Sequence, residues 1–293
     1  MRFQLQKFLP NNRRYSTEIL KAGSRFLKEN GVEEPRRNAE ILLSHLLKKP
    51  VHRIYADDER ITRGILPAYS KLLGKRASHT PLQYITGKVD FYKYVFSVEK
   101  GVLIPRPETE ILVEKAVSVY KEYFLPVRAR ILDIGSGCGN IAVSLAKEIK
   151  NCSIAATDIS LKALKVSHCN ALRHKVKSKI KFYKSDIFPP GKSRFHMIVS
   201  NPPYIPLADI AGLDEDVKRE PLTALSGGRD GTSVIRKILG RADVFLHEKG
   251  FLLMEIGYNQ ADFIRSFKCG MKLTGIERDL AGIERVAVFR KTG

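Results

Sequence analysis

An apolar stretch that runs directly into three regularly spaced glycines constrains the fold of this chain more than any other feature. Residues 131–134 read Ile-Leu-Asp-Ile, and Gly135, Gly137 and Gly139 follow. A buried strand that ends in such a turn and continues into a helix, here expected from 141 to 149, is typical of open α/β sheets. The pattern therefore predicts a doubly wound α/β fold in which the backbone of this turn approaches a ligand.

The spacing of the glycines argues against two common nucleotide-binding motifs. The dinucleotide motif is G-x-G-x-x-G, and Asn140 occupies the position of its third glycine. The phosphate-binding loop fails as well, because no Gly-Lys-Ser or Gly-Lys-Thr follows. We therefore expect a small ligand without a pyrophosphate to contact the loop, which consists of Gly135, Ser136, Gly137, Cys138 and Gly139.

A second predicted strand, residues 153–157, ends in a carboxylate. Asp158 lies 19 residues after Gly139, near the roughly 20-residue offset at which an acidic side chain accepts the hydroxyls of a ribose. The alternative is a tight turn with a solvated aspartate. We favour a ligand that carries a ribose.

The apolar run 195–200 ends in Asn201-Pro202-Pro203-Tyr204, which we interpret as the catalytic turn. Two prolines fix the backbone and remove two N–H groups, so the turn offers carbonyl oxygens as acceptors. Asn201 adds a side-chain oxygen and Tyr204 a flat ring, which suits a planar substrate with an NH₂ group. The alternative is a proline-rich strand exit in which Tyr204 is only a core or surface aromatic.

Together these motifs resemble the class I methyltransferases that use S-adenosylmethionine. More specifically, the chain resembles the release factor glutamine methyltransferases, the PrmC/HemK family, over nearly its whole length. The motifs that carry this resemblance are Leu-Ile-Pro-Arg-Pro-Glu-Thr-Glu at 103–110, Asp-Ile-Ser at 158–160, the catalytic turn, Glu-Pro at 220–221, Gly-Gly-Arg-Asp-Gly at 227–231 and Glu-Ile-Gly at 255–257. Small departures are Ser167, where alanine is usual, and Ile187, where some members carry tryptophan.

The resemblance implies a fold, a cofactor and a reaction. We expect a seven-stranded class I methyltransferase domain in which S-adenosylmethionine contacts the glycine loop with its methionine end, Asp158 with its ribose and Asp186 or Ile187 with its adenine. Asn201, which also borders the cofactor, and Pro202 each accept one hydrogen of a glutamine amide, and Tyr204 packs on its face. The resemblance assigns substrate binding to the same turn with Pro203, and to Arg106 and Pro107. No metal is expected.

The implied substrate is the glutamine of the Gly-Gly-Gln motif in class-1 peptide-chain release factors. A DNA or RNA adenine methyltransferase is the main alternative, because the exocyclic amine of adenine presents the same planar NH₂. A non-catalytic nucleic-acid-binding protein is a second alternative. The formal net charge of +20 favours an anionic partner without identifying it. We expect no stable nucleic-acid complex and a monomer.

Helical and strand patterns predict the order of the domains. Apolar residues share one helical face over 16–29, 35–50 and 61–77, so residues 1–86 are expected to form a helical substrate-recognition bundle. A hairpin linker at 87–102 follows, with a strand at 91–98, and 103–293 form the methyltransferase domain. Its strands are expected at 130–134, 153–157, 180–184, 195–200 and 251–256, with an antiparallel pair at 271–277 and 285–289.

Composition limits the cellular setting. No apolar run approaches the roughly 20 residues of a membrane span. The four cysteines show no C-x-x-C pair or metal-ligand spacing, so we expect no disulfide and no zinc, in a reduced cytoplasmic compartment. Cys138 is expected to be a small buried thiol. The N-terminal residues are basic and contain no acidic side chain up to Thr17, which leaves a mitochondrial transit peptide as an alternative.

Overall fold

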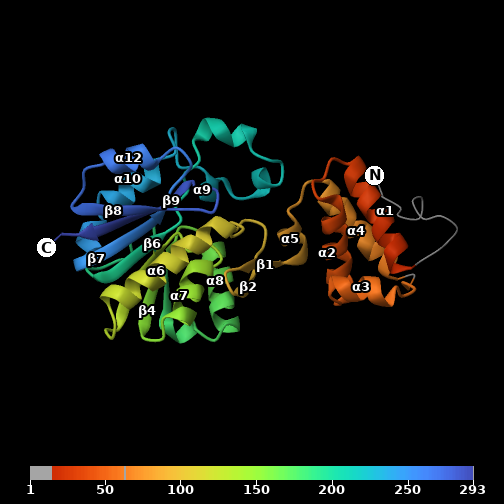
Figure 1. The fold of residues 1–293 in the computed structure, drawn as a ribbon, viewed down its shortest axis with the longest axis horizontal. Helices are drawn as coiled ribbons and strands as arrows, with labels where there is room; N and C mark the ends of the chain where they lie inside the picture. Colours follow the sequence, from red (N-terminus) through yellow and green to blue (C-terminus); the bar gives the residue numbers. More distant parts are fainter. Residues whose placement is uncertain (1–14, 63, 293) are drawn as a thin grey trace. The chain divides into compact units, whose positions relative to one another are not determined.

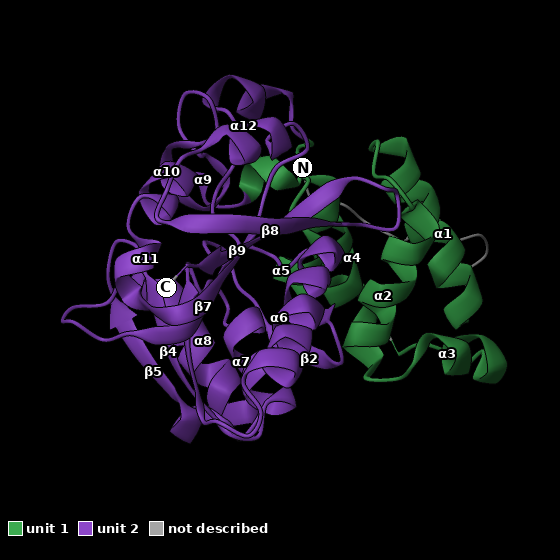
Figure 2. Cartoon of the chain, turned by 60° about the vertical axis from the view of Figure 1, so that its left-hand side comes forward, with its two compact units in different colours: residues 1–87, 214–219 green, residues 88–213, 220–293 purple. Residues whose placement is uncertain are grey.

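The computed structural model describes residues 15–62 and 64–292 (Figure 1). The possible transit peptide therefore lies almost entirely outside the described residues. The chain divides into two compact units, residues 1–87 with 214–219 and residues 88–213 with 220–293 (Figure 2). The three-part division at residues 86 and 102 stays a prediction about domains. Among the described residues, no helix has the length and apolar character needed to cross a bilayer.

The first unit is a bundle of helices around its own apolar core. Its helices are α1 (Ser16–Glu29), α2 (Pro35–Leu47), α3 (Val51–Asp57), α4 (Ile65–Ala77) and α5 (Leu82–Thr86). The bounds expected for α1 are confirmed, and Pro35 opens α2 as predicted. Tyr69 is fully buried and donates a hydrogen bond to the carbonyl of Ala39 at 2.9 Å. A Cβ at Gly23 would lie 2.6 Å from the hydroxyl of Tyr69, so only glycine fits there.

An ion pair holds the distant segment 214–219 within this unit. The side chain of Arg76 is only 6% exposed, and its two terminal nitrogens donate to the two carboxylate oxygens of Asp216 at 2.8 and 2.6 Å. The remaining guanidinium nitrogen, Nε, donates to Asn38 at 2.7 Å. Because the buried guanidinium needs this carboxylate, residues 214–219 are structurally part of the bundle.

The second unit contains a seven-stranded sheet in the order β5-β4-β3-β6-β7-β9-β8 (Figure 1). Its strands are β3 (Ala129–Ile134), β4 (Cys152–Asp158), β5 (Ile180–Lys184), β6 (Phe195–Ser200), β7 (Leu246–Glu255), β8 (Met271–Arg278) and β9 (Glu284–Lys291). The pairs among β3 to β7 are parallel, and β9 pairs antiparallel with both β7 and β8. The predicted doubly wound, seven-stranded methyltransferase fold is confirmed.

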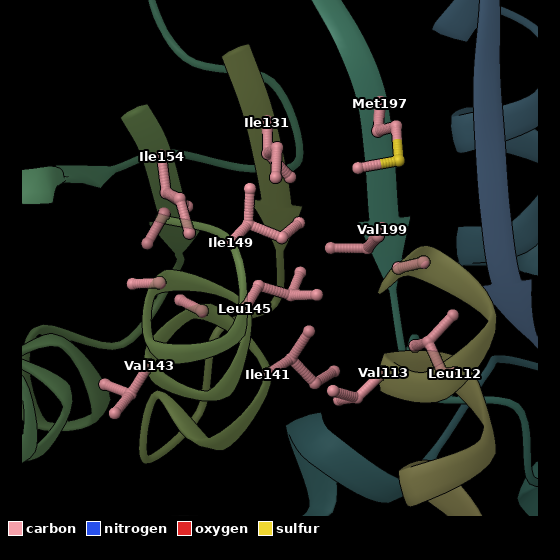
Figure 3. Close-up of a cluster of buried hydrophobic side chains, with 14 of the residues drawn as sticks. Leu112, Val113, Ile131, Ile141, Val143, Leu145, Ile149, Ile154, Met197 and Val199 are labelled. Atoms are coloured by element: carbon pink, nitrogen blue, oxygen red, sulfur yellow. The ribbon is translucent and has the colours of Figure 1, made fainter. Parts of the chain in front are cut away.

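Successive residues of each strand face opposite layers of helices. Ile131 and Val199 pack in a cluster with α6 (Glu110–Tyr123), α7 (Asn140–Glu148) and α8 (Leu161–Arg173). Figure 3 shows Ile131, Met197 and Val199 facing side chains of α6 and α7. Leu132 and Ile198 belong to the other cluster, with α10 (Ser233–Leu239), α11 (Ala242–Phe245) and α12 (Ala261–Ser266). Helices thus cover both faces of the sheet, as the alternation of elements predicts.

A two-stranded hairpin opens the second unit, and here one sequence expectation is wrong. Residues 91–98 do not form a single strand, because β1 (Lys88–Phe91) and β2 (Tyr94–Ser97) pair across a turn at Tyr92 and Lys93. Tyr92 has a φ of 57°, in the left-handed region. The alternation of aromatic and β-branched residues continues through the turn and hides it.

Candidate active site

A cavity of about 330 Å³ lies at the carboxyl ends of β3, β4 and β6, within the size range of small-ligand sites. The predicted site residues that line it are Gly135, Gly137, Asp158, Asp186, Ile187, Asn201, Pro202 and Pro203. The predicted residues that do not line it are Ser136, Cys138, Gly139, Tyr204, Arg106 and Pro107. The glycine loop and the catalytic turn, which are far apart in the sequence, therefore border one cavity.

The glycines of the loop have different functions. A Cβ at Gly137 would meet no atom within 4 Å, and one at Gly135 would meet only the carbonyl of Asn201 at 3.9 Å, so the backbone is open toward a ligand. At Gly139, which has a φ of +84°, a Cβ would lie 2.3 Å from the hydroxyl of Ser167. Gly139 therefore permits α7 to pack closely on α8, and it acts on the cavity only through the position of the loop.

Asp158 is fixed so that its carboxylate borders the cavity. Its Oδ2 accepts from the backbone N–H of Gly137 at 2.9 Å, and its Oδ1 accepts from that of Ser160 at 2.8 Å. Burial raises the pKa of Asp158, and the backbone hydrogen bonds oppose that rise. Because a carboxylate oxygen has two acceptor sites, each oxygen keeps one for a hydroxyl of a ligand. This arrangement fits a ribose.

Asp133, two residues before Gly135, is a buried carboxyl that was not predicted as a site residue. It is fully buried, and neither carboxylate oxygen makes a short hydrogen bond within residues 15–62 and 64–292. Burial raises its pKa to about 7, and the nearby charge of Asp158 adds to the rise. A cationic group in the neighbouring cavity would offset this cost.

Asp186 and Ile187 follow β5 at the edge of the cavity. Asp186 lies within 3.4 Å of the ammonium of Lys237 and is largely exposed. Ile187 has a φ of 72°, which is a strained conformation for a β-branched residue. The hydroxyl of Thr157 donates to the carbonyl of Ile187 at 2.6 Å and helps to hold this conformation. The backbone here is therefore shaped by its neighbours against its own preference.

The side chain of Asn201 has a defined orientation. Its Nδ2 donates to the hydroxyl oxygen of Thr109 at 2.9 Å, and Thr109 is only 1% exposed. The side-chain oxygen, Oδ1, is therefore the atom of Asn201 that remains for a ligand in the cavity. Pro202 and Pro203 follow without N–H groups, and both line the cavity. The acceptor role of this turn stays a prediction.

Buried polar contacts hold the rest of the turn. The Tyr204 hydroxyl donates to Oε1 of Glu255 at 3.1 Å, and burial raises the pKa of Tyr204. The amide of Gln260 donates to the carbonyls of Tyr204 and Gly231, each at 3.0 Å, and accepts from the N–H of Gly257 at 2.8 Å. Glu255 and Gly257 belong to a motif noticed in the sequence, but the contacts of Glu255 and Gln260 with the turn were not predicted.

Arg106 makes a buried contact that its sequence position did not reveal. One of its terminal nitrogens donates to Oε1 of Glu220, whose other oxygen accepts from the N–H of Ile104 at 2.9 Å. The side chain of Glu220 is 2% exposed. Pro107 begins the short helix η3 (Pro107–Thr109), which leads into α6. In this structure Arg106 therefore holds two chain segments together.

Comparison with known proteins shows which families this chain is similar to. Residues 18–87 match the PrmC N-terminal domain, and residues 109–211 match the methyltransferase small domain. A release factor glutamine methyltransferase from Thermodesulfovibrio yellowstonii is 36% identical over 87% of this chain and 92% of that protein. One from Geobacter sulfurreducens is 37% identical over 89% of this chain and 91% of that protein.

A second kind of relative is longer. A bifunctional methyltransferase from Rickettsia bellii is 33% identical over 98% of this chain but only 54% of that protein. The chain thus spans about half the length of that relative.

Proposed function

The chain belongs to the family of release factor glutamine methyltransferases, as its motifs indicated, and on that basis we propose that it methylates a release factor. The acceptor is the side-chain amide nitrogen of the glutamine in the Gly-Gly-Gln motif of class-1 peptide-chain release factors. The methyl donor is S-adenosylmethionine.

The observation that carries this proposal is the orientation of Asn201. Since Thr109 accepts from Nδ2, the side-chain oxygen of Asn201 is available to accept a hydrogen from a planar NH₂ group. The carbonyl of Pro202 is a second acceptor beside it, and Pro203 has no N–H that would compete. Two acceptors match the two hydrogens of a primary amide.

The residues of the turn act by orientation. An amide nitrogen is a poor nucleophile because its lone pair is delocalised into the carbonyl. Bound S-adenosylmethionine supplies the electrophilic methyl group on its sulfonium. Asn201 and Pro202 would hold the NH₂ hydrogens so that the lone pair of the nitrogen is free to accept the methyl group, and both acceptors would stabilise the positive charge that develops on nitrogen. The N–C bond forms as the S–C bond of the sulfonium breaks, and the nitrogen then releases one of its hydrogens as a proton to solvent. Tyr204 packs against the amide face.

Cofactor recognition is part of the same proposal. Asp158 accepts the ribose hydroxyls, and the backbone of the glycine loop contacts the methionine end. Asp186 and Ile187 border the adenine. The support is their position on one cavity together with the open backbone at Gly135 and Gly137. The loop also contains Ser136, Cys138 and Gly139, which do not line the cavity and affect the cofactor through the position of the loop backbone. Substrate binding also depends on Arg106 and Pro107, through the position of the segment that contains them.

A methyl-transfer assay with tritiated cofactor tests the proposed reaction. Intact release factor, a Gly-Gly-Gln peptide, a release factor with glutamine replaced by alanine, DNA and RNA are offered in parallel. We expect label only on the proteins and peptides that carry the glutamine. Label on adenine in DNA or RNA would transfer the assignment to the alternative activity.

We also propose that the helical bundle binds the release factor and that the enzyme acts as a monomer in the cytoplasm without a stable nucleic-acid complex. Lys21, Arg25 and Lys28 are exposed, and their spacing puts them on one face of α1. This face suits an acidic patch on a folded partner.

Charge neutralisation tests the role of the bundle without removing it. We expect Lys21→Gln, Arg25→Gln and Lys28→Gln together to raise the KM for intact release factor and to leave the KM for a Gly-Gly-Gln peptide unchanged. A matched triple replacement of exposed lysines of the other unit, Lys177, Lys181 and Lys192, is the control. Equal KM values for intact release factor in both triple variants would contradict the proposal.

A further inference from the structure

Two buried polar side chains from distant parts of the chain, Thr109 and Glu255, contact residues of the catalytic turn. Thr109 lies at the end of η3, Asn201 follows β6, and Glu255 ends β7. Thr109 and Glu255 are each 1% exposed. Asn201 donates to Thr109 at 2.9 Å, and Tyr204 donates to Oε1 of Glu255 at 3.1 Å. None of the functions proposed above requires Thr109 or Glu255 to touch a substrate.

The second carboxylate oxygen of Glu255, Oε2, has no hydrogen-bond donor among the described residues, and we assign the hydroxyl of Thr109 to it. Oε2 is buried and makes no short hydrogen bond in the described part of the chain. Two hydroxyl donors act on this carboxyl and lower its pKa, those of Thr109 and Tyr204. Since Tyr204 is bound to Oε1, the hydrogen of Thr109 is the one available to Oε2.

The number of hydrogens on each group then determines which group donates in each of these hydrogen bonds. A threonine hydroxyl has one hydrogen and two acceptor sites, whereas an ionised carboxylate only accepts. If Thr109 gives its hydrogen to Glu255, it has none for Asn201 and must accept from Nδ2. The amide oxygen of Asn201 is then forced to the other side, toward the cavity. If Thr109 instead donated to Asn201, the amide would turn over and present its NH₂ group.

We propose that Glu255 is a positioning residue which, through Thr109, sets the orientation of the Asn201 amide and, through the Tyr204 hydroxyl, fixes the ring of Tyr204. This inference rests on the proposed function and adds to it the residues that orient the acceptor. A reversed amide would place two hydrogens of Asn201 against the two hydrogens of the substrate NH₂. Two N–H donors that face each other form no hydrogen bond, so the substrate would not be held in the reactive geometry.

The charge state of Glu255 makes this arrangement dependent on pH. Burial raises the pKa of Glu255 to about 7, and Glu108 adds to the rise, whereas Thr109, Tyr204 and Arg285 oppose it. Below that pKa the carboxyl carries its own hydrogen and no longer requires the hydrogen of Thr109. The orientation is therefore enforced above the pKa, and the rate should fall as the pH decreases through about 7.

A pair of matched variants separates orientation from packing. Thr109→Val keeps the shape of the side chain and removes the hydroxyl, and Thr109→Ser keeps the hydroxyl. We expect Thr109→Val to lower kcat by about 10–100-fold, as for residues that orient a metal ligand. The Kd for S-adenosylmethionine should stay unchanged because Thr109 does not line the cavity. Thr109→Ser should retain most of the parent rate. Thr274→Val, which removes a hydroxyl bound to the carbonyl of Val288, is the control.

Glu255→Gln gives an independent test. Its NH₂ group would donate to Thr109, whose hydrogen would then turn to Asn201. We expect a loss of kcat at all pH values and no acidic decline in kcat, while the parent shows that decline near pH 7. Thermal unfolding of each variant shows whether it is folded. If Thr109→Val is not folded, the pH profile of kcat for Glu255→Gln tests the inference in its place.

The outcomes distinguish this inference from the proposed function. If the parent enzyme methylates another NH₂ substrate and no release factor, the proposed function is refuted. The kcat of Thr109→Val relative to that of Thr109→Ser on that substrate would still test whether Thr109 and Glu255 orient Asn201. A parent-like kcat for Thr109→Val, or an unchanged acidic decline in Glu255→Gln, would overturn the inference.

Discussion

Replacing Asp158 with alanine should weaken cofactor binding far more than replacing an aspartate outside the cavity that also accepts from a backbone N–H. The carboxylate borders the cavity and accepts from the N–H groups of Gly137 and Ser160. Two ribose hydroxyls would add two charge-assisted hydrogen bonds at about 1.5–3 kcal/mol each. The lower end of that range gives about 3 kcal/mol, which corresponds to about a 100-fold higher Kd for S-adenosylmethionine. Loss of the contact with Gly137 loosens the loop and adds to the effect.

Titration calorimetry of the purified variants measures this change. Asp158→Asn should also bind weakly, since an asparagine has one oxygen and must turn its NH₂ toward the N–H of either Gly137 or Ser160. Asp230→Ala is the control, because Asp230 also accepts from a backbone N–H, that of Thr232 at 3.0 Å, but does not line the cavity. A Kd for Asp158→Ala equal to that of Asp230→Ala would refute the ribose assignment.

Four further substitutions test the loop and the turn. Asn201→Ala should lower kcat by about 10²–10³-fold at saturating substrate and leave the melting temperature nearly unchanged; full turnover would exclude the acceptor mechanism. Ser167→Ala should raise the free energy of unfolding by about 1 kcal/mol in denaturant titrations, because its hydroxyl is buried without a short hydrogen bond to any described residue. Gly139→Ala should be strongly destabilising in the same titrations and less so together with Ser167→Ala, since its Cβ would lie 2.3 Å from the hydroxyl of Ser167; additive effects would contradict this contact. The pKa of Asp133 rises from 3.8 to about 7 on folding. The stability that this carboxyl contributes is therefore complete below pH 3.8 and is lost as the pH rises to about 7. Asp133→Asn should therefore be more stable than the parent above pH 7 without cofactor, and a parent-like pH profile of unfolding would exclude the burial effect.

The parts of the fold and site that could be predicted are those encoded by local sequence. The run 195–200 is mostly apolar, with His196 and Ser200 as its polar residues, and is β6 at the expected bounds, because a strand buried on both faces needs no strict alternation. Asn201 and Asp158 could be assigned to a ligand site because Asn201 directly follows β6 and Asp158 is the last residue of β4. The turn at Tyr92 was missed because its residues continue the strand pattern.

The contacts that orient these side chains could not be predicted, because they join residues far apart in the sequence. Thr109 and Asn201 are separated by 92 positions, and Tyr204 and Glu255 by 51. Threonine and glutamate are common residues, and only the register of β6 beside β7 brings Glu255 behind the turn. For the same reason the ion pair of Arg106 with Glu220 could not be predicted.

The membership of residues 214–219 in the helical unit has a consequence for how such enzymes can be recombined. The N-terminal unit is built from two separate stretches of the gene, and Arg76 in one stretch requires Asp216 in the other. A chimera that exchanges only residues 1–87 between two relatives would join a guanidinium from one parent to a loop from the other. Exchange of the helical unit therefore has to transfer both stretches together, and residues at positions 76 and 216 should change as a pair when relatives diverge.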